Sequence, residues 1–125
     1  MRRDVELGPY MRFKKKYLEG VLSGKKHVTV RYGVVRPRFS LIFIVCCGEI
    51  YGEAVITRVY YTKLGRLGED VVAAEGLHSR DDLVNELREI YGEVRDDDAV
   101  SVIFFTLVRR YEKPVPLSHL RGGRA

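Results

Sequence analysis

The feature that most constrains the fold is the apolar run "LIFIVCC" at residues 41–47. A strand with one face in water alternates apolar and polar residues, and this run does not alternate. The stretch "AVSVIFFTL" at residues 99–107 is also apolar on both faces over much of its length. The sequence therefore predicts two strands buried on both sides, and a sheet that is covered by other elements on both faces.

The remaining pattern predicts helices and strands around these two runs. Residues 13–24 have helical apolar spacing and end at Gly24, and residues 28–31 alternate as a strand with Val28 and Val30 on one face. A long strand follows residue 50, and Gly52 within it suggests a bulge or a close backbone approach. We expect the loop "VVRPRFS" at residues 34–40 to be irregular.

Two helices are predicted before the last strand. The first covers residues 68–75 and ends at Gly76, and the second follows the N-cap Ser79 with an apolar stripe of Leu83, Leu87 and Ile90. The expected order is helix, three strands, two helices and a final strand. This order predicts an α+β domain built on a small mixed or closed barrel, with helices before the first and before the last strand.

The length of 125 residues suits a single domain, which we expect to span residues 1–113, followed by a tail at residues 114–125 that docks loosely or frays. The apolar run at residues 41–47 is too short to cross a bilayer. Cys46 and Cys47 are neighbours on a predicted strand, so their side chains should point to opposite faces and not pair. These features favour a cytoplasmic protein without structural disulfides.

The formal net charge of +5 favours an anionic partner, and nucleic acid is the first candidate. The basic residues Lys14, Lys15 and Lys16 in the first helix could follow a phosphate backbone without reading sequence, although a solvated helix face explains them equally well. The three histidines are scattered, and "DDD" at residues 96–98 lacks the alternating acidic ligands of a calcium loop. We therefore expect no metal and no cofactor.

Four segments resemble the ASCH (ASC-1 homology) domain family. They are "YLEGVLSGKKHVTVRYG", "GEAVITRV", "EDVVAAEGLHSRDDLVNELREIYG" and "AVSVIFFTL", which together extend from about Phe13 to Leu107. The resemblance implies a PUA-like β-barrel and recognition of RNA or a nucleotide in a cleft beside it. Two departures concern this cleft, because "RPRFS" replaces the usual "GD" turn and His27 replaces a smaller residue.

The resemblance also implies a candidate active site. Some small members of the family are amidohydrolases that act on N4-acetylcytidine with a lysine, a threonine and a glutamate, which fall here on Lys26, Thr29 and Glu75. The strand arginine of the family falls on Arg31. A lysine of lowered pKa could activate the threonine hydroxyl, and the glutamate could orient the amide or protonate the leaving amine.

Three functions remain open at this stage. In the first, Lys25, Lys26 and Arg31 bind RNA or a nucleotide without catalysis, with Glu75 accepting a base amino group. In the second, the lysine, threonine and glutamate hydrolyse an acylated cytidine. In the third, the basic helix docks a protein partner. A structural ion pair between Arg31 and Glu75 would weaken the catalytic interpretation most.

Overall fold

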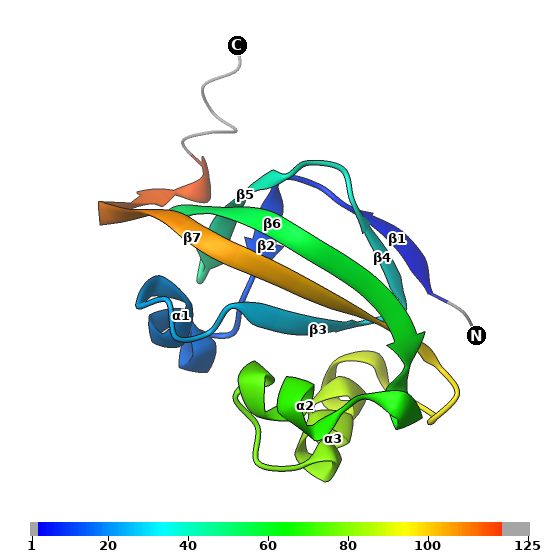
Figure 1. Ribbon diagram of the computed structural model, residues 1–125. Helices are drawn as coiled ribbons and strands as arrows, with labels where there is room; N and C mark the ends of the chain where they lie inside the picture. The colour runs from blue at the N-terminus through cyan, green and yellow to red at the C-terminus, as the bar shows by residue number, and fades with distance from the viewer. Residues whose placement is uncertain (1–2, 119–125) are drawn as a thin grey trace.

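The computed structural model describes residues 3–118, and its elements confirm the α+β class (Figure 1). In chain order they are β1 (Asp4–Leu7), β2 (Tyr10–Arg12), α1 (Lys15–Leu22), β3 (Val28–Tyr32), β4 (Val34–Pro37), β5 (Leu41–Cys46), β6 (Glu49–Lys63), a 3₁₀ turn (Leu64–Arg66), α2 (Glu69–Glu75), α3 (Arg80–Tyr91) and β7 (Ala99–Pro116).

The strands form two sheets. A five-stranded sheet has the order β2-β5-β6-β7-β3, in which β2 pairs with β5 in parallel and the other pairs are antiparallel. A two-stranded ribbon joins β1 to β4 in parallel. The edge strands of the larger sheet are therefore β2 and β3, and the strand pairing among residues 3–118 does not close a barrel.

The two apolar runs of the sequence occupy interior positions of the sheet, as predicted. Successive residues of β7 pack into two clusters, since Val102 joins the cluster under α2 and α3, while Ile103 and Phe105 join the cluster under α1. The first cluster also holds Leu83 and Leu87 of α3. Figure 1 shows α2 and α3 together against β3 and β7, with α1 near one end of β3.

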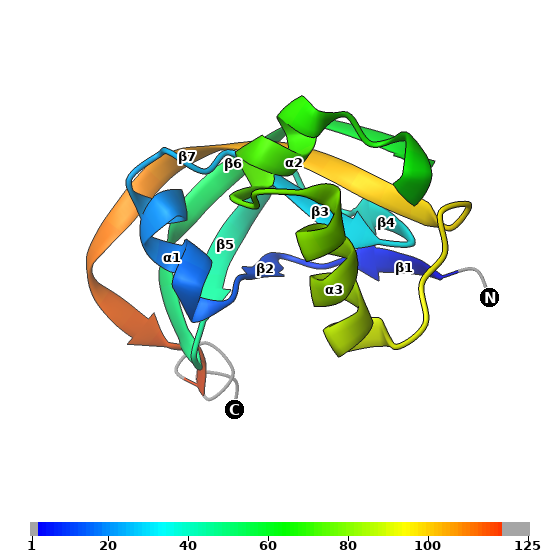
Figure 2. The same ribbon diagram turned by 90° about the horizontal axis from the view of Figure 1, so that it is seen from below.

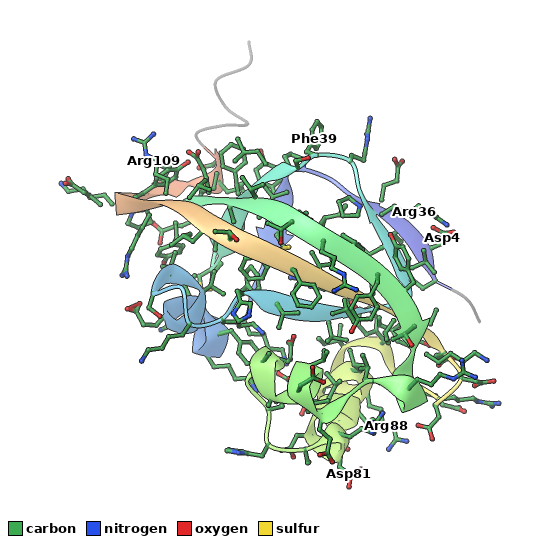
Figure 3. The ribbon with its side chains drawn as sticks, viewed as in Figure 1. Asp4, Arg36, Phe39, Asp81, Arg88 and Arg109 are labelled. Atoms are coloured by element: carbon green, nitrogen blue, oxygen red, sulfur yellow. A yellow bond between two sulfur atoms is a disulfide. The ribbon has the colours of Figure 1, made fainter. Side chains whose placement is uncertain are left out.

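Three strands were not predicted from the sequence. The helix α1 follows β1 and β2 and so does not precede the first strand, and the expected loop at residues 34–40 contains β4. Both N-terminal strands are short and pair in parallel with strands more than 25 residues away. Such partners leave no local sequence signal. In Figure 3, Asp4 and Arg36 lie side by side across the β1–β4 ribbon, where Oδ1 and Nε are 3.2 Å apart.

Several local predictions are confirmed and two differ. Gly76 ends α2 in the left-handed region with φ of 100°, and Ser79 caps α3 by accepting the Asp82 N–H. Ile90, however, is 56% exposed and lies outside the α3 stripe. The strand β7 continues through residues 114–116, which we expected to begin the tail, and residues 119–125 lie outside the described part.

The adjacent cysteines are joined by a disulfide, contrary to the sequence prediction. The prediction assumed that both lie on a strand, but β5 ends at Cys46 and Cys47 begins the two-residue turn to β6. Cys47 and Gly48 both have positive φ, 60° and 80°, as in a tight hairpin turn. This backbone turns the two side chains to the same side.

Gly52 lies where β6 bulges against β7, as the sequence suggested. A Cβ added at this glycine would collide with the carbonyl oxygen of Arg109. We expect Gly52→Ala to lower the free energy of unfolding by about 1–3 kcal/mol, because backbone atoms must move to admit the methyl group. Gly8→Ala is the control, because a Cβ there meets no atom within 4 Å. Urea denaturation of both variants measures the difference, and equal effects would contradict the prediction.

Candidate functional site

The side chain of Arg31 bridges the two edges of the five-stranded sheet. Its Nη2 donates to the carbonyl oxygen of Arg12 on β2 at 2.7 Å, and its Nε donates to Thr29 Oγ1 at 3.2 Å. The guanidinium also lies 5.3 Å from the centre of the Phe13 ring. Burial lowers the pKa of Arg31 from its usual value. We call the junction of β2 and β3 the seam.

One edge of β3 remains unpaired at the seam. The His27 carbonyl and the Gly33 N–H bond to β7, so backbone groups of odd-numbered residues in β3 face β7. The backbone groups of Val30 and Tyr32 therefore face the other way. The Val30 N–H donates to Glu75 Oε2 at 2.7 Å, which places the end of α2 against this free edge.

Glu75 forms a buried ion pair with Lys26, rather than with Arg31. Lys26 Nζ donates to the carbonyl oxygen of Glu75 at 2.7 Å and lies 3.3 Å from Oε2. The two residues are only 7% and 6% exposed. Burial lowers the pKa of Lys26 and raises the pKa of Glu75, and the attraction between the two charges opposes both shifts.

The second carboxylate oxygen of Glu75 remains accessible. Oε2 takes the contacts from Val30 and Lys26, and Oε1 has no hydrogen bond within residues 3–118. No fully buried side-chain polar atom in that range lacks a partner, so Oε1 keeps some contact with solvent. Glu75 also lines a pocket at the seam. A ligand there could donate a hydrogen bond to Oε1.

This seam pocket has a volume of about 110 Å³ and lies between α1, the free edge of β3 and α3. Figure 2 shows α1 and α3 on either side of β2 when the molecule is viewed from the helical side. The lining includes four aromatic residues, Phe13, Tyr17, Tyr32 and Tyr91, and five charged residues, Arg12, Lys14, Arg31, Glu75 and Glu86. The pocket is small beside typical ligand pockets of roughly 300–1,000 Å³. A base-sized ligand therefore requires its walls to part.

The three residues of the predicted catalytic set are close together but are not connected as expected. Thr29 and Glu75 line the seam pocket, whereas Lys26 lines a second groove between α1 and α2. Tyr17 lines both and separates them, with its ring centre 4.8 Å from Lys26 Nζ. Thr29 Oγ1 accepts from Arg31, and within the described chain it has no hydrogen bond to Lys26 or Glu75.

The lysines of the first helix are less free than their exposed positions suggested. Lys14 Nζ and Lys16 Nζ lie 3.1 and 2.9 Å from Glu86 Oε1, and the Tyr17 hydroxyl donates to Glu86 Oε2 at 2.7 Å. These contacts hold the pKa of Glu86 below its usual value although burial opposes the shift. Lys15 and Lys25 are exposed.

Sequence reasoning missed Tyr17 and Glu86 as residues of the site. Tyr17 lies within the segment whose apolar spacing predicts the first helix, and Glu86 is 69 residues away from it in the chain. Helical spacing puts Lys14, Lys15 and Lys16 mostly on the side opposite Tyr17, so no local signal brought this cluster together. Within residues 3–118, no group of three histidine, cysteine or acidic side chains is arranged to hold a metal ion. None of the helices formed there is long and apolar enough to cross a bilayer.

Comparison with known proteins identifies relatives of this fold. A family model described as the ASCH domain matches residues 8–109. The ASCH protein of Zymomonas mobilis is 18% identical with a TM-score of 0.68, over 94% of this chain and 78% of that one. The ASCH domain of Lactobacillus crispatus is 17% identical with a TM-score of 0.61, over 87% and 82% of the two chains.

A third similar structure is the N-terminal domain of McrB from Staphylothermus marinus. It is 14% identical with a TM-score of 0.56, over 96% of this chain and 81% of that one. At identities this low, the likeness concerns the fold alone. No curated protein matches the chain significantly.

Proposed function

Because the chain belongs to the ASCH domain family and has its PUA-like α+β fold, we propose that it binds RNA or a nucleotide in the seam pocket. The observation that carries this proposal is the convergence of a guanidinium, an accessible carboxylate oxygen and a free strand edge on one pocket with aromatic walls. Each of these groups suits a different part of a nucleotide.

The base would be recognised at the free edge of β3. Glu75 Oε1 and the Val30 carbonyl oxygen are acceptors, and the Tyr32 N–H is a donor on the same edge. The amino and imino groups of a nucleobase can form hydrogen bonds with this row of acceptors and donors, as they do with the edge of another base. Tyr17, Phe13 and Tyr91 supply faces on which the base can stack.

Arg31 would provide charge next to the base. Its bonds to Thr29 and Arg12 use Nε and Nη2, which leaves Nη1 to donate to a phosphate or a carbonyl of the ligand. Beyond the pocket, Lys15 and Lys25 are exposed and add to the positive charge of the protein surface. The net charge of +5 acts in the same direction.

Titration of fluorescent single-stranded and hairpin RNA at several salt concentrations tests the proposal. We expect binding that weakens as salt rises, because phosphate contacts release counterions. Competition by mononucleotides would place the site in a pocket rather than along an extended surface. An absence of binding at low salt would reject the proposal.

A second candidate function is hydrolysis of an N4-acylcytidine. The specific observation in its favour is the buried Lys26, whose pKa is lowered toward the range of a general base, next to Glu75. The observation against it is that Thr29 bonds to Arg31 and not to Lys26. Incubation with N4-acetylcytidine and chromatography for cytidine tests it, with Thr29→Val as the control. No turnover, or turnover that survives the substitution, rejects it.

The docking of a protein partner by the basic helix has less support than either function. Glu86 neutralises much of the charge of Lys14 and Lys16, so this helix presents less free charge than its sequence suggests.

A further inference from the structure

The most concentrated charge cluster outside the Lys26–Glu75 pair lies at the rim of the seam pocket. Three donors, the ammonium groups of Lys14 and Lys16 and the hydroxyl of Tyr17, converge on the carboxylate of Glu86 at 2.7–3.1 Å. Lys14 Nζ also lies 3.8 Å from Oε2 of Glu89, which follows Glu86 by three residues on α3 and is largely exposed. Lys14, Tyr17 and Glu86 all line the seam pocket.

We propose that Lys14, Lys16 and Tyr17 form a phosphate subsite, and that Glu86 occupies it in the free protein as an internal substitute for the phosphate. The inference rests on the proposed function, because the subsite opens into the same pocket as Arg31 and Glu75. It assigns the phosphate group of the ligand to the rim and the base to the free edge of β3.

The chemistry of the cluster fits an anion with several acceptor oxygens. Two ammonium groups and one phenol present their hydrogens to a single point, and a tetrahedral phosphate can accept all three bonds. The carboxylate of Glu86 uses Oε1 for both lysines and Oε2 for the phenol. The present bonds therefore already divide between two oxygens, as they would on a phosphate.

The position of Glu86 also explains the small volume of the pocket. Glu86 belongs to α3 and its three partners lie on or just before α1, so the contacts connect the two walls of the pocket. A phosphate that replaces the carboxylate would release α3 from α1. The pocket could then widen to admit the base.

The occupied subsite selects for ligands that bring a phosphate. A nucleoside has no phosphate to pair with the two lysines, so it cannot replace Glu86, and the Glu86 carboxylate stays bound to them. A nucleotide replaces one anion by another and keeps the charge balance. Glu86 would therefore act against ligands that lack a correctly placed phosphate.

The test is a comparison of Glu86→Gln with Glu89→Gln by NMR titration of the full chain with inorganic phosphate. Both substitutions remove one negative charge from α3 near Lys14, but only the first removes the charge that competes with phosphate for the subsite. We expect Glu86→Gln to raise the affinity for phosphate about tenfold, because a competing charge is removed. Glu89→Gln should change it less than twofold. Equal effects of the two variants, or no gain in Glu86→Gln, would overturn the inference.

A second measurement does not depend on the folding of a variant. In the unsubstituted protein, saturating phosphate should shift the backbone amide signals of residues 14–17 together with that of Glu86. No shift at these residues would overturn the inference.

Adenosine, cytidine and their 5′-monophosphates separate this inference from the proposed function. Nucleosides that bind while phosphate has no effect at residues 14–17 reject only the subsite. Phosphate that binds at the rim while no nucleoside, nucleotide or RNA binds at the seam supports the subsite and counts against the proposed function.

Discussion

Replacing Lys26 with methionine should lower the free energy of unfolding by about 3–5 kcal/mol, because it leaves Glu75 buried without its cation. The ammonium group of Lys26 contacts both the carboxylate and the main-chain carbonyl of Glu75, and both side chains are less than one-tenth exposed. Without Lys26, the hydrogen bond from the Val30 N–H would be the direct contact left to stabilise the charged carboxylate. Urea denaturation measures the loss.

The loss should depend on pH in a defined direction. Burial already raises the pKa of Glu75, and without the attraction of Lys26 the pKa rises further. A carboxyl whose folded pKa is raised binds its proton more tightly in the folded state, so its contribution to stability is largest below the unfolded pKa and is lost as pH rises through the folded pKa. The deficit of Lys26→Met should therefore shrink between neutral pH and about pH 5.

Two further variants control for this prediction. Lys25→Met removes the same charge from the neighbouring exposed residue and should have little effect on stability. Lys26→Met combined with Glu75→Leu removes both buried charges and should recover much of the loss. A Lys26→Met deficit no larger than that of Lys25→Met would contradict the buried pair as a determinant of the fold.

Replacing Arg31 with alanine should weaken RNA or nucleotide binding by about 10- to 100-fold, the value of a lost charge-assisted hydrogen bond. Arg31 is the charged side chain that joins both edges of the seam at the pocket. If its guanidinium contacts a phosphate of single-stranded RNA, the slope of log K against log salt should fall by about 0.7. Fluorescence titration at four or more salt concentrations measures both quantities.

Arg36→Ala is the matched control for Arg31→Ala. Arg36 carries the same charge but lies on β4, where it pairs with Asp4 and is largely exposed. We expect it to leave binding within about twofold of the original protein. If the two variants lose affinity equally, the contribution of Arg31 is general attraction and not a specific contact. Thermal unfolding of both variants separates a loss of binding from a loss of structure.

Local pattern was sufficient for the parts of the site that lie on one element. The alternation of residues 28–31 placed Thr29 and Arg31 on one face of β3 and Val28 and Val30 on the other, as observed. Gly76 identified the end of the helix that carries Glu75. These features follow from the period of a strand and from the freedom of glycine at positive φ, which act within a few residues.

Partner choice was decided by the tertiary structure. The sequence allowed an ion pair of Arg31 with Glu75, but the turn after α1 brings Lys26 to Glu75 and leaves Arg31 to the carbonyl of Arg12. Parallel pairing of β2 with β5 brings that carbonyl to the seam. No local pattern of the chain encodes this arrangement.

The sequence by itself determined the α+β class, the buried strands, the main helix ends and the polar face of β3. The tertiary structure alone decided that Glu86 covers the lysines of α1 and that Lys26, rather than Arg31, pairs with Glu75. The physical reason is range. Periodicity and backbone preference act between residues close in the chain, whereas an ion pair forms between any two charges that packing brings together, whatever their separation in sequence.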